Sequence, residues 1–229
     1  MQAFKKEVDR RNRDNSDLEA NIVAVLQSYR EDVERIVFNG DGYSEAWEKE
    51  AEARGLSNNK TTPIALRAMI SEKSKEVFEN QCVFTENELQ ARYEVQIENY
   101  LSKVGIEADL LETMSRTFIL PAANEHLNKL GETYRNLNAM GLKNQSQHIV
   151  AQVTPVTDLT ERLGEDLSRL VEAKSAADSI GNAGERAEAY ADKVKPLFGD
   201  VRASIDNLEG LVDDKIWPLP KYRELLFLR

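Results

Sequence analysis

Residues 85–141 read TENELQARYEVQIENYLSKVGIEADLLETMSRTFILPAANEHLNKLGETYRNLNAMG, and this stretch decides the fold. Thr85 and Glu88 form a capping box, the pair of side chains that opens a helix. Apolar residues then recur at steps of three or four: Leu89, Tyr93, Ile97, Tyr100, Val104, Ala108, Leu111, Met114 and Phe118. Beyond Phe118 the pattern continues through Ala122, Leu127, Leu130, Tyr134 and Leu137 to Gly141, so it predicts one helix of about 80 Å, at about 1.5 Å per residue. Pro121 lies inside the pattern, so we expect a kink near Phe118 or a break there.

Two more helical patterns follow towards the C-terminus. Residues 141–153 are amide-rich and predict a connection, after which Thr154 and Pro155 predict a helix start. The first pattern is Val156, Thr160, Leu163, Leu167, Leu170, Lys174 and Ala177; the second is Ala187, Ala191, Val194, Phe198, Val201, Ile205, Leu208 and Val212. Both have heptad spacing, and a short turn at residues 181–184 separates them. Helices joined in this way pack antiparallel, and Pro196 should bend the second one.

The N-terminal third of the chain carries shorter helical signals. Helix-opening signals occur at Ser16 with Glu19, at Ser44, at Thr62 with Pro63, and at Ser71. The first predicts a helix over residues 17–37, and Gly55 should end the second helix. We therefore predict an all-α fold: an elongated helical bundle of long antiparallel helices, preceded by a few short N-terminal helices. The expected domains are a short-helix region at 1–84 and a long-helix bundle with an aromatic tail at 85–229.

Composition argues against several classes of protein. The net charge is −10, and binding to nucleic acid needs a cationic surface. The one basic cluster, Lys5, Lys6, Arg10, Arg11 and Arg13, is interrupted by acidic residues, which favours a solvated helix face over a binding patch. Cys82 is the single cysteine, which fits a reducing cytosol. No apolar run of about 18 residues and no signal peptide occurs, so we expect a cytoplasmic protein without a membrane partner.

The search for chemical motifs yields no catalytic, cofactor-binding or metal-ligating residue. His126 and His148 are the only histidines, and a di-iron site of the ferritin type needs Glu three positions before each His. Positions 123 and 145 hold Ala and Gln, so that interpretation fails. No glycine-rich phosphate loop is present, and the NGDG sequence at residues 39–42 is more typical of a plain turn than of an anion site.

The C-terminal tail is the candidate functional segment. It reads WPLPKYRELLF over residues 217–227 and concentrates apolar area where fraying is common. The predicted docking residues are Trp217, Leu219, Tyr222, Leu225, Leu226 and Phe227. Pro218 and Pro220 keep the backbone extended, a form suited to a groove. Two placements remain open: docking on the chain's own bundle, or contact with a neighbouring subunit.

Several long segments are similar to the C-terminal region of type III glutamine synthetases. They are NGDGYSEAWEKEAEARGL at 39–56, NKTTPIAL at 59–66, VFTENELQARYEVQIENY at 83–100, ILPA at 119–122, and the tail. The resemblance covers residues 38–140 and 187–227. It implies that a glutamate–ammonia ligase core precedes this region, and that the full-length enzyme uses ATP and a divalent metal such as Mg²⁺. The ligase core's metal-binding glutamates, glycine-rich loop and nucleotide segment have no counterpart here.

The resemblance therefore implies an accessory or assembly region of an enzyme of nitrogen metabolism. We expect the short-helix region at 1–84 to adjoin the ligase core, with that core and the neighbouring subunits of a homo-oligomer as partners. We expect the 229-residue chain alone to be inactive as a ligase. The alternative is a free-standing helical interaction or regulatory module that lacks ligase activity. No constellation of residues in the sequence supports a third hypothesis, that the chain is a helical enzyme in its own right.

Overall fold

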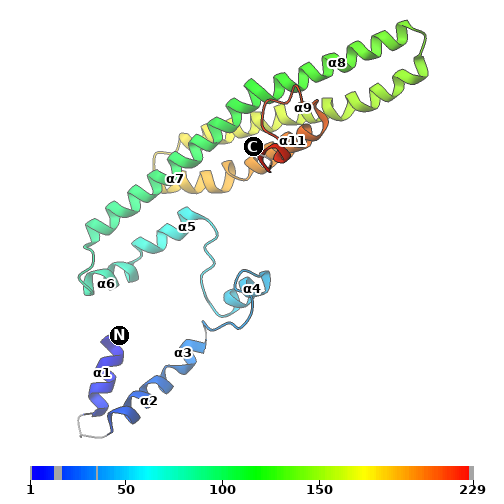
Figure 1. The fold of residues 1–229 in the computed structure, drawn as a ribbon. Helices are drawn as coiled ribbons and strands as arrows, with labels where there is room; N and C mark the ends of the chain where they lie inside the picture. Colours follow the sequence, from blue (N-terminus) through cyan, green and yellow to red (C-terminus); the bar gives the residue numbers. More distant parts are fainter. Residues whose placement is uncertain (1, 13–16, 35, 227–229) are drawn as a thin grey trace. The chain divides into compact units, whose positions relative to one another are not determined.

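The computed structural model describes residues 2–12, 17–34 and 36–226, and within these ranges every regular element is a helix. The predicted all-α class is confirmed. The chain divides into two compact units, Met1–Asn59 and Lys60–Arg229, and each is described by itself below (Figure 1).

The N-terminal unit contains α1 (Gln2–Arg11), α2 (Leu18–Ser28), α3 (Arg30–Glu34) and α4 (Glu45–Ala53). Asp17 is the N-cap of α2, and its carboxylate accepts hydrogen bonds from the backbone amides of Glu19 and Ala20. Ser16, the expected cap, lies outside the described residues. The single helix predicted over 17–37 is wrong, because α2 ends at Ser28 and Tyr29 separates it from α3.

Helix α4 has the predicted boundaries. The Ser44 hydroxyl accepts a hydrogen bond from the Trp47 amide, and Gly55 follows the helix with a φ of 74°. The Leu56 amide donates to the Ala51 carbonyl, which completes a Schellman ending. The Phe38 and Trp47 rings stack with centroids 4.5 Å apart, and Arg54 donates to the Val37 carbonyl. These contacts close the NGDG loop back onto α4.

The second unit begins with short helices that pack on a long one. These are α5 (Thr62–Arg67), the 3₁₀ turn η2 (Ala68–Ile70) and α6 (Glu72–Asn80), and all three contact α7 (Glu86–Met114). The division between compact units therefore falls at Asn59, whereas the helical signals of the sequence predicted a domain boundary at residue 84. Thr61, one residue before the expected Thr62, is the N-cap position of α5.

Helix α7 continues through a π-helical turn, η3 (Ser115–Ile119), into α8 (Leu120–Ala139). The predicted capping box of Thr85 and Glu88 is present. The Leu120 amide donates to the Ser115 carbonyl five residues back, one residue before Pro121. This wide turn adds one residue to the pattern. Phe118 is consequently 50% exposed and Ile119 1% exposed, so the expected place of Phe118 in the apolar stripe is wrong.

Helix α9 (Lys143–Asp178) corrects another expectation. Residues 143–153 belong to this helix and Pro155 lies inside it, so neither the predicted connection nor the helix start at Thr154 is found. Only a tight turn joins α8 to α9. Gly141 has a φ of 80°, and the Leu142 amide donates to the Leu137 carbonyl. The chain thus reverses within this turn, and α9 runs back along α8 (Figure 1).

The remaining bundle helices are α10 (Ala183–Ala189), the π turn η4 (Tyr190–Val194) and α11 (Leu197–Leu211). Helix α11 packs on α9, as the heptad spacing predicts (Figure 1). The bend expected at Pro196 takes the form of η4, in which the Lys195 amide donates to the Tyr190 carbonyl. Fully buried members of the main core include Ile119, Val156, Leu163, Leu167, Leu170, Val194, Val201 and Leu208. The core therefore lies along the seam of α7, α8, α9 and α11.

Candidate functional site

The first half of the C-terminal tail is packed on the bundle of its own chain. Trp217 is 7% exposed and belongs to the main core, and Leu219 packs against that core. The Lys221 ammonium donates to the Glu209 carbonyl at 2.7 Å and pairs with Asp214 at 2.6 Å. These contacts hold the segment between Trp217 and Lys221 against α11.

The second half of the tail differs. It forms the short helix α12 (Tyr222–Leu226), in which Leu225 is 54% and Leu226 62% exposed. The Tyr222 side chain and the whole of Phe227 lie outside the described residues. The six predicted docking residues are therefore not one group in the structure. Trp217 and Leu219 contact the bundle, whereas Leu225 and Leu226 face outward.

The N-terminal unit exposes much of its apolar surface. Its described buried apolar side chains are Val8, Val25 and Ala51. Its exposed large apolar side chains are Leu18, Val23, Leu26, Val33, Ile36, Val37 and Tyr43. These side chains are candidates for contacts with a partner, because large apolar patches on protein surfaces commonly mark interaction sites.

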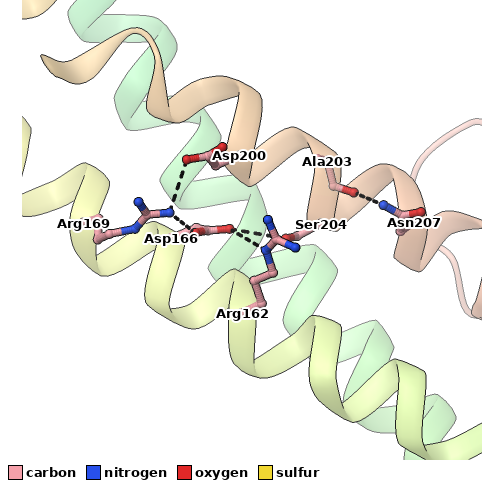
Figure 2. Close-up of polar contacts among 7 residues, drawn as sticks. All are labelled: Arg162, Asp166, Arg169, Asp200, Ala203, Ser204 and Asn207. Carbon is pink, nitrogen blue, oxygen red and sulfur yellow. Dashed lines mark hydrogen bonds and ion pairs between the residues drawn. The ribbon is translucent and has the colours of Figure 1, made fainter. Parts of the chain in front are cut away.

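A buried carboxylate lies at the seam between α9 and α11 (Figure 2). Asp166 is 2% exposed, and both of its oxygens have partners. One pairs with the Arg169 guanidinium, which also contacts Asp200 at 3.2 Å. The other accepts from the Ser204 hydroxyl at 3.4 Å and lies 3.9 Å from Arg162. Sequence reasoning missed this cluster, although an acidic residue between Leu163, Leu167 and Leu170 with an Arg on either side is a readable signal.

This cluster links two helices at a fixed register. Asp166 and both arginines belong to α9, whereas Asp200 and Ser204 belong to α11 (Figure 2). The hydrogen bond to Asp166 raises the pKa of Arg169, so the guanidinium keeps its charge. The arginine side chains remain more than half exposed while the carboxylate is buried. Sliding α11 along α9 would separate Ser204 and Asp200 from their partners and leave Asp166 less well satisfied.

A second polar cluster joins α7, α9 and η4. The Tyr190 hydroxyl donates to Asp178 at 2.6 Å, and the Lys174 ammonium pairs with Asp109 at 3.0 Å and Asp178 at 3.4 Å. Burial raises the pKa of Tyr190, and its hydrogen bond to Asp178 raises it further. The phenol is therefore a hydrogen-bond donor at ordinary pH. We assign this cluster a packing role at the junction of the three elements.

The two histidines lie far apart in the sequence and make different contacts. The His126 Nδ1 accepts a 3.4 Å hydrogen bond from the Asp213 amide, which connects α8 to the end of α11. The His148 Nδ1 lies 3.0 Å from the Gln145 carbonyl. Within the described ranges, no three His, Cys, Asp or Glu side chains stand together as ligands for a metal ion. In the same ranges, no helix combines the length and apolarity needed to cross a bilayer.

Comparison with known proteins adds a family assignment to this geometry. Residues 21–138 match the family described as the glutamine synthetase C-terminal domain. The chain is 33% identical to a glutamine synthetase of Bacteroides fragilis, in an alignment that covers 100% of this chain and 32% of that protein. It is 34% identical to the type-3 glutamine synthetase of Dictyostelium discoideum, over 85% of this chain and 27% of that protein. The chain thus spans about a third of the length of these curated relatives.

Proposed function

We propose, since the chain belongs to the glutamine synthetase C-terminal domain family, that it is the accessory assembly region of a type III glutamine synthetase. In this role it stabilises the subunit or its homo-oligomer, while a ligase core supplies the chemistry. ATP, a divalent metal such as Mg²⁺, glutamate and ammonia would bind to that core. The proposed setting is nitrogen metabolism in the cytoplasm.

The observation that carries this proposal is the apolar surface of the N-terminal unit. Large apolar side chains are exposed there, and few of the described apolar residues of this unit are buried. Helices this short gain most of their stability from packing an apolar face against a partner. A ligase core or a neighbouring subunit would provide that cover. The bundle, by contrast, buries its own core.

The test uses the full-length protein from the natural reading frame, with and without these 229 residues. We expect removal of this region to lower the melting temperature or dissociate the oligomer, and we expect the region alone to form no glutamine. Light scattering gives the mass, a thermal melt gives the stability, and glutamine formation gives the activity. Unchanged mass, stability and turnover after removal would refute the accessory role.

A matched pair of variants focuses the test on the apolar surface. Leu26→Glu places a charge on an exposed apolar position of α2, and Gln27→Glu places the same charge on the neighbouring exposed polar position. Both variants should leave the isolated chain folded. Only Leu26→Glu should weaken assembly of the full-length enzyme. If the two variants assemble equally well, the apolar surface is not part of the interface.

The alternative is a free-standing helical interaction or regulatory module. The same exposed surface would then bind a different protein, so the length of the natural reading frame separates the two possibilities. An in-frame ligase core favours the assembly region. A genuine start site at Met1 without such a core favours the module.

A further inference from the structure

A cleft of about 300 Å³ lies beside the C-terminal tail. Its walls come from the end of α7 and from η3, from α11, and from the tail itself. The apolar part of the lining is Leu111, Met114, Ile119, Ile205, Trp217, Leu219 and Pro220. A volume of this size is at the lower end of the range for sites that bind small molecules, and such sites are mostly apolar with a few polar groups.

Trp217, which lines the cleft, carries a polar group that has no partner. Its indole Nε1 is buried, and no acceptor for it is found among the described residues. Buried Trp N–H groups usually have a hydrogen-bond partner, because a buried donor without an acceptor destabilises the fold. The rest of the indole is packed in the core. Trp217, a residue that lines the cleft, thus carries a buried donor for which the described residues provide no acceptor.

The charged residues at the cleft restrict the ligand. Arg202 pairs with Asp206 at 3.5 Å, and Glu209 adds a second carboxylate to the lining. The nearby Lys221 ammonium pairs with Asp214 and donates to the Glu209 backbone carbonyl. The carboxylates of the lining therefore exceed its cations by one. This excess disfavours an anionic ligand. The mostly apolar lining favours an uncharged ligand over a cation, because a cation would lose its hydration there.

We propose that this cleft binds a small uncharged molecule with an apolar body and one hydrogen-bond acceptor, which Trp217 Nε1 recognises. Because Nε1 is covered in the present arrangement, the indole must turn slightly towards the cleft for the acceptor to reach it. Binding is thereby linked to the position of the tail. The proposal concerns a ligand of the bundle and is independent of the assembly role proposed above.

Two probes of matched shape test the proposal on the whole chain. Acetophenone has an apolar ring and a ketone acceptor, and alpha-methylstyrene replaces the ketone oxygen by a CH₂ group. The readouts are the indole N–H signal of Trp217 and the methyl signal of Met114 in nuclear magnetic resonance spectra. The Trp47 indole lies in the other unit and serves as the internal control, assigned with Trp47→Phe.

We expect saturable binding of acetophenone in the range of about 1 mM, since so small a ligand has few contacts. Acetophenone should move the Trp217 N–H signal downfield. Its affinity should exceed that of alpha-methylstyrene by about fivefold, because that ratio corresponds to the net free energy of one hydrogen bond. Trp217→Phe should abolish the preference for acetophenone over alpha-methylstyrene, while the Met114 methyl signal still responds to both probes. Ile205→Phe should fill the cleft and weaken both. Equal affinity of the two probes for the unchanged protein, or no response of Met114 to either, would overturn the proposal.

Discussion

Gly184 marks a close approach between α10 and α7, and replacing it by Ala gives a sharp test of the bundle. A Cβ added at this position would lie 2.7 Å from the Tyr93 hydroxyl oxygen and 3.3 Å from the Asn182 side-chain oxygen. The first distance is shorter than real Cβ contacts, and Tyr93 is buried in a core with Ile97 and Ala187. Either the ring or the start of α10 must therefore move.

The expected magnitude follows from two opposing effects. Overpacking a buried position costs about 1–3 kcal/mol, and Ala in place of a helical Gly regains up to about 1 kcal/mol. We therefore expect Gly184→Ala to reduce the free energy of unfolding by about 1–2 kcal/mol. For a unit of this size, that loss lowers the melting temperature by roughly 2–8 °C. Urea unfolding and thermal melts followed by circular dichroism measure both quantities.

Tyr93→Phe provides the rescue. It removes the hydroxyl, after which the nearest Tyr93 atom would be Cζ at 3.9 Å, an ordinary contact. In this background Gly184→Ala should be neutral or stabilising, so the two changes should couple by about 1–3 kcal/mol. Gly164→Ala in α9 is the control, because its added Cβ meets nothing within 4 Å and should stabilise the helix. If Gly184→Ala stabilises the unchanged protein as Gly164→Ala does, α10 does not approach α7 as described.

Three further changes probe the bundle and its tail. Val201→Asp should lower the free energy of unfolding by more than about 3 kcal/mol, because Val201 is fully buried in the heptad seam and the new charge would have no partner there; an unchanged melt would show the register to be wrong. Asp166→Ala should lower the free energy of unfolding, measured with urea, by about 1.5–3 kcal/mol, whereas Asp166→Leu should recover most of that loss. If both variants lose the same amount, the polar network is not the source of the effect. Deleting residues 217–229 should cost about 3–5 kcal/mol, since it removes buried Trp217. A fall in mass by light scattering without a change in the melt would contradict the internal dock and indicate an interface.

The regular parts of the fold could be predicted from the sequence because they depend on local patterns. The capping box at Thr85 and the heptad positions Val201 and Leu208 have the roles that spacing assigns to them. The pattern failed at Phe118, because the π turn changes the spacing by one residue and spacing alone cannot detect it. It also failed over residues 143–153, where Pro155 and a polar surface conceal a helix that packing on α8 stabilises.

The candidate site was only partly accessible to sequence reasoning. The tail is visible as apolar area near a chain end, but its division between packed Trp217 and exposed Leu226 depends on tertiary contacts. The Asp166 cluster requires Ser204 and Asp200, which are brought to it by a reversal of the chain. The exposed apolar residues of the N-terminal unit lie in α2, in α3 and in the segment that follows, so no single helical pattern marks them. Only the packing shows that these side chains are exposed.

The two π turns have a consequence for how the sequence of this bundle can change. Each ends two residues before a proline, η3 before Pro121 and η4 before Pro196, and in each the residue just before the proline donates to the carbonyl five residues back. We therefore expect the extra residue and the proline to occur together in related sequences. A relative that lacks the proline can also lack one residue there and keep the same core, so its alignment should show a single-residue gap at the turn. If this chain and such a relative were aligned without a gap, every core position after the turn would be shifted by one residue.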